Sequence, residues 1–452
     1  MTCRLRKAFV FCFVVLIALS AGIPPVSAQS QQYIVTFEPG TPRSERASAV
    51  ARHGAGLRFN YGIIDGVAIT VPNENALRAL EREGNVRSIT PDFEVFATQS
   101  VHASDKANGN GAKGKPGGGS SGGTVSPQTV PLGVQRVVGA SNPNPHTGLG
   151  VGVAIVDTGI DLNHPDLGPK GGSFSVFNGG NCQDDNGHGT HVAGTVAALD
   201  NTRDVVGVAP NATLYCVKVL NSQGSGNWSG IIAGLDWIWA NGPSQNPPIR
   251  VVNMSLSGRG DNLDSPFKAA VERLHEAGII VVVAAGNDSS LEASQQVPAA
   301  YAASGLVLTI ASSTAVSGLP GSGGCNFVVP ADSASFFTTD GIDVSVSAPG
   351  EDQENVSRFG NGCTLNSVGI LSLKLGGGTT RMSGTSMATP HVTGIVARIM
   401  QDPNHYGLPL TPTTEMVRDY LRSTASGPGI APLDSRAAFT FDGIREGIAV
   451  IR

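Results

Sequence analysis

Charge is scarce along this sequence. Asp, Glu, Lys and Arg together make up 14% of the 452 residues, and the formal net charge of −5 is spread over both halves of the chain. Binding to nucleic acid or to an anionic membrane surface needs concentrated positive charge, so neither is expected. Beyond the first 30 residues, no apolar run approaches the roughly 20 residues needed to span a bilayer. The sequence therefore predicts a chain without a membrane partner, once any leader has been removed.

Cysteine is also rare, and no CxxC spacing occurs among the six cysteines. Two of them lie in the first 12 residues, and the other four are Cys182, Cys216, Cys325 and Cys363. An even number in an exported chain predicts two disulfides, for which three pairings are possible. We favour Cys182–Cys216 and Cys325–Cys363. A zinc site is the alternative, although the spacing does not support it.

The first residues have the features of a secretory signal peptide. Three basic residues precede an apolar run from Ala8 to about Ala21, and the small residues Val26-Ser27-Ala28 follow at cleavage-site positions. This run is too short to make a good membrane-spanning helix. We therefore expect residues 1–28 to be removed and the protein to be secreted to the extracellular space. A retained N-terminal anchor is the alternative.

A small separate domain is expected at residues 29–97. "YIVTFEP" and "GVAITVP" are typical of strands, Thr41-Pro42 starts one helix, and Asn73 caps another. The resulting βαββαβ order predicts a split sheet with two helices on one face. Residues 98–127 are rich in glycine and have almost nothing to bury, which indicates a flexible, protease-accessible linker.

Residues 128–452 have a different pattern, in which short, nearly continuous apolar runs alternate with helical segments. Runs such as "VGVAIVD", "ATLYCVKVL", "VVNMSLS", "GIIVVVAAGN" and "LVLTIAS" are typical of strands buried on both faces. The alternation predicts a doubly wound α/β domain with a mainly parallel sheet flanked by helices. In such a domain the chemistry gathers beyond the carboxyl ends of the strands.

Three residues at element boundaries could form a catalytic relay. Asp157 ends a strand, His188 starts a helix between two glycines, and Ser386 starts another helix. A serine hydroxyl becomes a good nucleophile only beside a base, and that base needs an orienting carboxylate. Asn287, beyond a further strand, could stabilise an oxyanion together with the backbone N–H of Ser386. Singly, these residues could be helix caps, a core histidine or turn residues, but together they indicate a serine nucleophile.

The segments around these residues resemble those of the subtilases, the subtilisin-like serine proteases. They are "AIVDTGIDLNHPDL", "NGHGTHVAGT", "VVNMSLS", "VVVAAGN" and "GTSMATPHVTG". The chain order Asp, His, Ser is also that of subtilisin. The resemblance covers residues 128 to about 400, and "QTVPLGV" at 128–134 is similar to the start of a mature subtilisin. Residues 33–97 are similar to the inhibitory propeptide of the family.

The resemblance implies a role for each site residue. Ser386 would attack the scissile carbonyl, His188 would carry the proton, and Asp157 would orient the imidazole. Asn287 would donate to the oxyanion. The substrate backbone would pair as an added strand with Gly224, Ser225 and Gly226. The pocket for the residue before the cleaved bond would be walled by Ser255, Leu256, Ser257, Ala284, Ala285 and Gly286.

The sequence departs from the family pattern in three places. Ser257 stands where the family usually has glycine, which would narrow the mouth of the pocket. Residues 318–378 differ widely from the pattern, and we expect extra loops there on one face. The linker at 98–127 is longer than expected.

A structural calcium site is also implied by the resemblance, because "AALDNTRDVVGVAP" has the length of the family's calcium loop. Calcium prefers six to eight oxygen ligands from carboxylates, amides and backbone carbonyls. The matching side chains are those of Gln128, Asp166 and Asn201, and the matching carbonyls are those of Leu199, Arg203 and Val205. A solvated turn at "DNTRD" is the alternative.

The sequence therefore predicts a secreted serine endopeptidase that acts on proteins or peptides and is made as a self-processing preproprotein. Its own propeptide would be an intramolecular inhibitor, and the enzyme is expected to be a monomer. A catalytically inactive homologue that binds peptides is the first alternative. A secreted adhesion or structural protein, with the glycine-rich segment as a spacer, is the second.

Overall fold

The computed structural model describes residues 31–98, 127–139, 144–177, 181–259, 265–360, 362–428 and 446–451. The expected signal peptide at 1–28 and nearly all of the expected linker lie outside the described residues. No helix within these ranges is long and apolar enough to cross a membrane.

The first unit is a small antiparallel sheet with two helices. Its elements are β1 (Gln31–Phe37), α1 (Arg43–Arg52), β2 (Gly56–Asn60), β3 (Gly66–Val71), α2 (Glu74–Leu80) and β4 (Val86–Pro91). The sheet has the order β2-β3-β1-β4 and encloses its own apolar core. Asn73 caps α2 by accepting a hydrogen bond from the N–H of Ala76. The chain then leaves this unit as a short strand, β5 (Glu94–Ala97), which pairs elsewhere.

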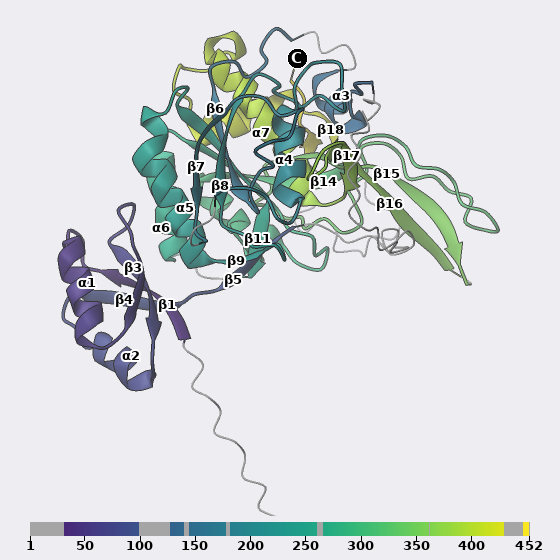
Figure 1. The fold of residues 1–452 in the computed structure, drawn as a ribbon. Coiled ribbons are helices and arrows are strands. Elements are labelled where there is room, and N and C mark those ends of the chain that lie inside the picture. The colour runs from purple at the N-terminus through teal and green to yellow at the C-terminus, as the bar shows by residue number, and fades with distance from the viewer. Residues whose placement is uncertain are drawn as a thin grey trace, which may run out of the picture.

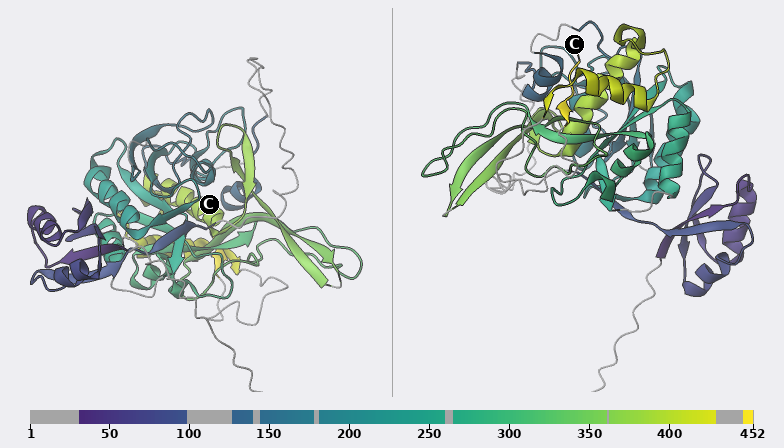
Figure 2. Two further views of the ribbon diagram at one scale, coloured as in Figure 1. Left: turned by 60° about the horizontal axis from the view of Figure 1, so that its bottom comes forward. Right: turned by 180° about the vertical axis from the view of Figure 1, so that it is seen from behind.

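The second unit is built on a large twisted sheet, shown in Figures 1 and 2. Its main path is β17-β16-β15-β14-β12-β10-β6-β8-β7. These strands are β6 (Gly152–Asp157), β7 (Lys170–Ser175), β8 (Thr213–Lys218), β10 (Ile249–Met254), β12 (Ile280–Ala284), β14 (Val307–Thr314), β15 (Val346–Phe359), β16 (Gly362–Leu373) and β17 (Thr379–Met382). From β7 to β15 every pair is parallel. The predicted doubly wound, mainly parallel sheet is confirmed.

Helices cover both faces of this sheet. They are α3 (Leu132–Val138), α4 (His188–Ala197), α5 (Trp228–Asn241), α6 (Pro266–Glu276), α7 (Thr385–Gln401) and α8 (Thr414–Thr424). Along β6, Val153 and Ile155 pack in the core that contains α4 and α7, whereas Ala154 and Val156 pack in the core that contains α5 and α6. Side chains of a strand alternate between faces, so burial on both sides explains the continuous apolar runs in the sequence.

Shorter elements complete the fold. They are the strands β9 (Ser225–Asn227), β11 (Leu256–Arg259), β13 (Gln296–Val297), β18 (Ser426–Pro428) and β19 (Gly447–Ile448), and the 3₁₀ turns η2 (Gly242–Ser244), η3 (Ala293–Gln295), η4 (Ala299–Ser304) and η5 (Pro403–Tyr406). The segment predicted as one strand, "VVNMSLS", is divided between β10 in the large sheet and β11 in a separate small sheet. The region expected as extra loops, 318–378, contains a long antiparallel hairpin of β15 and β16.

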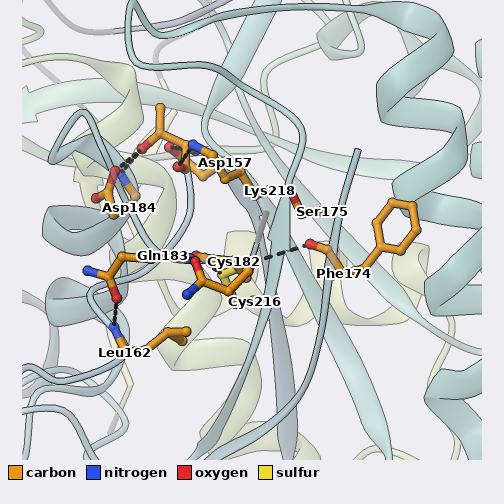
Figure 3. The surroundings of a disulfide bond; sticks show 12 residues. Asp157, Leu162, Phe174, Ser175, Cys182, Gln183, Asp184, Cys216 and Lys218 are labelled. Atoms are coloured by element: carbon orange, nitrogen blue, oxygen red, sulfur yellow. Dashed lines mark hydrogen bonds between the residues drawn. A yellow bond between two sulfur atoms is a disulfide. The ribbon is translucent and has the colours of Figure 1, made fainter. Parts of the chain in front are cut away.

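Both favoured cysteine pairings are confirmed as disulfides. Cys182–Cys216 joins the segment after β7 to β8 (Figure 3), and Cys325–Cys363 joins the loop after β14 to β16. The zinc alternative is therefore wrong, because the four sulfurs are already paired.

Candidate active site

Asp157 and His188 form a buried hydrogen-bonded pair. Asp157 is the last residue of β6, His188 is the first residue of α4, and both are fully buried. The Nδ1 atom of His188 lies 2.8 Å from Oδ1 of Asp157. That oxygen also accepts the N–H of Thr158 at 2.6 Å. The carboxylate is thus positioned to hold the N–H of the imidazole on Nδ1 and to leave Nε2 as the basic nitrogen.

The residue after His188 must be glycine for a steric reason. A Cβ on Gly189 would lie 2.0 Å from the backbone oxygen of Gly159, so any side chain would push β6 and α4 apart. Gly187, before the histidine, has a φ of 107°, a conformation that favours glycine. Both residues therefore allow His188 to approach Asp157 closely.

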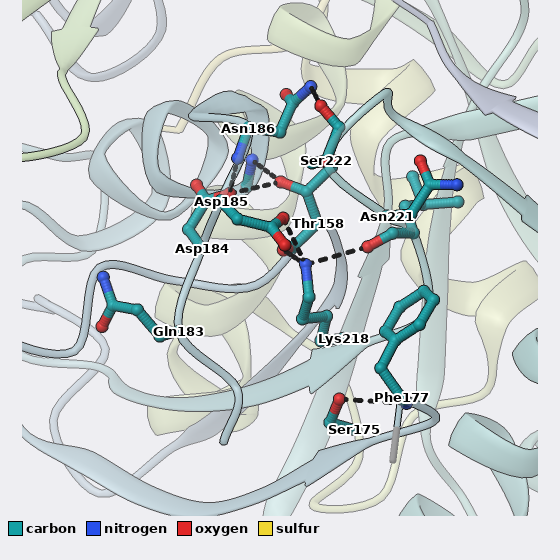
Figure 4. Close-up of polar contacts among 12 residues, drawn as sticks. Thr158, Ser175, Phe177, Gln183, Asp184, Asp185, Asn186, Lys218, Asn221 and Ser222 are labelled. Atoms are coloured by element: carbon teal, nitrogen blue, oxygen red, sulfur yellow. Dashed lines mark hydrogen bonds and ion pairs between the residues drawn. The ribbon is translucent and has the colours of Figure 1, made fainter. Parts of the chain in front are cut away.

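Asp184, which the sequence reasoning missed, joins the end of β6 to the start of α4. Its Oδ1 accepts the hydroxyl of Thr158 at 2.9 Å (Figure 4) and the N–H of Gly187 at 3.0 Å. Its Oδ2 accepts the N–H and the hydroxyl of Thr190 at 2.9 and 2.6 Å. Burial opposes ionisation of this carboxyl, but the hydrogen bonds outweigh burial and lower its pKa. The signal in the sequence was an aspartate a few residues before a helix start.

Lys218 is a second missed residue at this edge of the sheet. Its buried ammonium group donates to the carbonyls of Thr158 and Leu220 and pairs with Asp185 at 2.7 Å (Figure 4). Because Lys218 lies opposite Asp157 in the sheet register, it ties together the two strand ends beside the histidine.

Ser386 lies at the start of α7, which packs against α4. The residue is fully buried, and its hydroxyl donates to the carbonyl of Ser255 at 2.9 Å. Its Oγ also lies 2.5 Å from the hydroxyl of Thr98, and its N–H donates to the carbonyl of Thr98 at 3.2 Å. Among the described residues, Nε2 of His188 has no hydrogen-bond partner and is a free acceptor.

Asn287 follows β12, and its side-chain amide accepts hydrogen bonds through Oδ1 while its Nδ2 donates none to the described residues. Its Oδ1 accepts both the N–H and the hydroxyl of Thr385, at 2.9 and 2.8 Å. These two bonds fix the orientation of the amide beside Ser386. Its Nδ2 is buried and has no partner within the described part of the chain. Buried donors are rarely left unpaired, so this group indicates a site for an acceptor that is absent here.

The strand β5 lies between two strands of the second unit. It pairs antiparallel with β9 on one side, where Val95 lies opposite Gly226 and Phe96 opposite Ser225, and the N–H of Ala97 donates to Gly224. On the other side it pairs antiparallel with β11, where Leu256 lies opposite Ala97 and Ser257 opposite Phe96. The N–H of Thr98 reaches the carbonyl of Ser255 at 3.4 Å. A peptide chain therefore runs through the cleft as a middle strand and brings one carbonyl to Ser386.

The predicted pocket residues fall into two groups, one along the strand β5 and one at the end of β12. Ser255 and Leu256 lie along the bound strand, and Ser257 faces a phenylalanine that is half exposed. Ala284 and Ala285 are buried at the end of β12, and Gly286 has a φ of 119° and donates to the hydroxyl of Thr385. A pocket-wall role for residues 284–286 stays a prediction.

The first unit also binds the surface of α5. The buried carboxylate of Asp92 accepts the N–H and the hydroxyl of Ser229, at 2.8 and 2.6 Å, at the first turn of that helix. The carboxylate of Asp236, farther along α5, accepts the N–H of Ile63 at 2.7 Å. Phe93 packs on Trp228 with ring centroids 4.9 Å apart. These contacts favour the docked position of β5, since a carboxylate at a helix N-terminus is stabilising.

The residues of the predicted calcium loop lie around one point. The side-chain amide of Gln128 lies 2.7 Å from the carbonyl of Leu199, and that of Asn201 lies 2.6 Å from Oδ1 of Asp166. The N–H of Val205 donates to Oδ2 of the same carboxylate.

Burial raises the pKa of Asp166 to about 6, against the effect of these hydrogen bonds. Nearby cationic charge would relieve that burial cost. Rotation of either amide by 180° would turn its oxygen toward the same point.

The fit to calcium therefore rests mainly on neutral oxygens. Within the described ranges no group of three or more His, Cys, Asp or Glu residues could hold a metal ion. The donors gathered here are one carboxylate, two side-chain amides and backbone carbonyls, which is a set that calcium accepts. The N–H of Arg203 donates to Asn201, which shapes the loop, but a ligand role for its carbonyl stays a prediction.

Comparison with known proteins gives consistent matches. A family model described as "Subtilase family" matches residues 148–441. Subtilisin E of Bacillus subtilis (strain 168) is 31% identical over 415 residues, which is 90% of this chain and 88% of that protein. Subtilisin of Bacillus pumilus is 38% identical over 303 residues, covering 66% of this chain and 92% of that protein.

A solved structure, described as that of a cold adapted subtilisin-like serine proteinase, is also similar. It has a TM-score of 0.54 and 30% identity, and the match covers 71% of this chain and 98% of that one.

Proposed function

The chain belongs to the subtilase family and is a subtilisin-like serine endopeptidase, and we propose that it cleaves proteins through Asp157, His188 and Ser386. The observation that carries this proposal is the strand β5, which runs through the cleft and presents the carbonyl of Thr98 to the N–H of Ser386. A substrate that binds in the same way would have its scissile carbonyl at the serine.

In the proposed mechanism the hydroxyl of Ser386 leaves the carbonyl of Ser255 and gives its proton to Nε2 of His188. Oγ then forms a bond to the carbonyl carbon, and the negative charge that develops on the oxygen is stabilised by the N–H of Ser386 and by Nδ2 of Asn287. The C–N bond breaks as His188 returns the proton to the leaving amine. A water molecule, deprotonated by the same imidazole, releases the acyl group and restores Ser386.

Asp157 would act on the histidine alone. Its bond to Nδ1 holds the tautomer in which Nε2 is free, and its charge stabilises the imidazolium that forms. A missing contact between His188 and Ser386 before attack does not exclude this, because catalytic hydrogen bonds often tighten only when substrate reacts.

We propose that the first bond cut lies in the chain itself, between Thr98 and Gln99. The released piece would end at Thr98 and contain the inhibitory propeptide domain at 29–97, whose tail stays in the cleft. Several contacts outside the cleft support this, notably that of Asp92 with Ser229 on α5 and that of Ile63 with Asp236, which lies on α5. Cutting within one molecule is favoured because serine and carbonyl are already close, so their effective concentration is high.

Calcium at the loop of Asp166 and secretion through the signal at 1–28 complete the proposal. The residues that would hold calcium are Gln128, Asp166 and Asn201 by their side chains, and Leu199, Arg203 and Val205 by their carbonyls. Calcium bound there would neutralise a buried carboxylate and stiffen the loop between α4 and β8. The mature enzyme would be an extracellular monomer.

Two measurements test the proposed function. A serine-reactive phosphonate should label Ser386 in the purified protein. The intact mass should correspond to a chain whose first residue lies after Thr98 and no later than the end of the segment up to Pro127. The Ser386→Ala chain, exported from a host without other extracellular proteases, should keep its N-terminal unit and lose only its signal. Trimming of Ser386→Ala in such a host would contradict self-processing. A lack of labelling would favour an inactive peptide-binding homologue or an adhesion protein.

A further inference from the structure

The outer part of the long hairpin forms a rigid arm. We define the arm as β15 from Glu351 to Phe359 and β16 from Gly362 to Val368. It projects beyond the body of the molecule (Figures 1 and 2). The Cys325–Cys363 disulfide fastens it to the preceding loop, whose Leu319 carbonyl accepts the N–H of Val356 at 3.0 Å. A small apolar core lies beneath this junction. The arm is therefore a hairpin held in place by a disulfide and a hydrogen bond, and not a loop.

One edge of β16 in the arm has no neighbouring strand. β17 pairs with Ile370–Leu373 only, and no described strand continues it along the arm. The backbone of Val356 points away from β16, toward Leu319. In an antiparallel pair, the backbone N–H and C=O groups of two opposed residues either both point toward the partner strand or both point away from it. Leu365 lies opposite Val356, so its N–H and C=O point away from β15, to the free edge.

The alternation along a strand extends this orientation to Cys363 and Ser367. In the described part of the chain we find no hydrogen bond to the outward backbone groups of Cys363, Leu365 and Ser367. The segment "GCTLNSV" at 362–368 contains no charged residue and no proline. Charged residues and proline are the usual protection of an exposed edge strand. This edge is therefore open to another strand.

The arm leads through β17 into α7, the helix that carries Ser386. The N–H of Gly384 donates to the carbonyl of Gly350 at 3.2 Å, just before the arm begins. The views in Figures 1 and 2 place the first unit and the arm at opposite ends, with β5 directed from one toward the other. A polypeptide that continues past Ser386 in the direction of β5 therefore heads toward the arm.

We propose that the free edge of β16 binds the part of an extended protein substrate that follows the cleaved bond, as an added strand. This inference rests on the proposed function. Main-chain hydrogen bonds would supply the affinity, and the uncharged edge would accept varied sequences. Seven residues at about 3.4 Å each give the edge a length of about 24 Å, so only a substrate with a long segment after the cut can pair along all of it.

The test compares two quenched-fluorescent peptides with the enzyme produced from the full chain and purified after self-processing. Both peptides carry Glu-Val-Phe-Ala-Thr, the sequence at 94–98, before the scissile bond. One continues for about two uncharged residues and the other for about twelve, so that only the second can span the edge. We expect kcat/KM to be about fivefold or more higher for the long peptide, the effect of one or two net hydrogen bonds.

Leu365→Pro removes one outward N–H without removing a bond to β15, and Ser367→Pro does the same nearer the base. Both should lose the advantage of the long peptide and keep the wild-type rate on the short one. Leu365→Ala is the matched control, because it loses the same side-chain packing but keeps the N–H, and it should retain the advantage.

Three results would overturn the proposal. One is an equal kcat/KM of the wild type on the two peptides. Another is a loss of the advantage in Leu365→Ala as large as in Leu365→Pro. The third is a wild-type dimer in sedimentation that Leu365→Pro dissociates, because the edge would then hold a second copy. If neither peptide is cleaved, the proposed function itself fails and this inference fails with it.

Discussion

Replacement of Asn287 tests the oxyanion site most directly. The wild-type residue leaves Nδ2 free beside Ser386, while its Oδ1 accepts two hydrogen bonds from Thr385. In Asn287→Leu the oxyanion would retain one donor, the N–H of Ser386. Removal of one oxyanion donor in subtilisin itself is known to lower kcat by about 10²–10³, or about 3–4 kcal/mol, and we expect the same range here with little change in KM.

The same substitution also has a structural cost. Asn287→Leu leaves the buried N–H and hydroxyl of Thr385 without their acceptor, and each such loss destabilises a protein by about 1–3 kcal/mol. Asn287→Asp is the matched variant, because it keeps the acceptor oxygen that binds Thr385, whereas it removes the amide donor and brings a negative charge next to the oxyanion. Both variants should lose turnover, and only Asn287→Leu should also melt markedly lower.

The assay is kcat and KM on a short peptide, with thermal melting of each variant. The reasoning is refuted if Asn287→Asp keeps turnover within about threefold of the wild type, because the donor then contributes little. It is equally refuted if KM rises while kcat holds, which would make Asn287 a binding or turn residue only.

Removal of calcium by EDTA should lower the Tm and speed self-digestion, because calcium at a hundredfold excess over Kd adds about 2.7 kcal/mol to the free energy of unfolding. Asp166→Ala should abolish most of that sensitivity to EDTA. Because burial raises the pKa of Asp166 to about 6, the effect of EDTA should shrink as the pH falls below that value, and a pH-independent effect would count against this carboxylate as a ligand. Burial and the adjacent Glu354 raise the pKa of Glu351 well above its ordinary 4.5, so the folded chain holds that proton more tightly and loses stability as the pH rises. Glu351→Gln should therefore melt higher than the wild type at pH 9 and similarly at pH 4, and equal Tm values at both would contradict a buried neutral carboxyl. Asp184→Asn should lower both kcat and Tm, since it weakens the hydrogen bonds to Thr158 and to α4. An unchanged kcat in a folded variant would show that those bonds do not position the histidine.

Local patterns were enough to predict the class of fold and the candidate catalytic residues. Continuous apolar runs such as "GIIVVVAAGN" predicted strands buried on both faces, because a parallel sheet covered by helices has no polar face. The glycines beside His188 predicted a close approach of two segments, and Gly189 indeed lies against Gly159. The even cysteine count predicted two disulfides, but the sequence alone allowed three pairings, and the structure contains the favoured one.

Other features depend on contacts between residues distant in the sequence, and only the tertiary structure decided them. Asp184 and Lys218 both bind Thr158, which is distant from each of them in the sequence, so the local pattern around them does not reveal that they meet beside the histidine. The hairpin of β15 and β16 was expected as loops, because residues 318–378 depart from the family pattern. Thr98 reaches Ser386 only because β5 crosses from one unit to the other. Sequence pattern reports how each segment is buried, whereas the meeting of two segments is set by the packing of the whole chain.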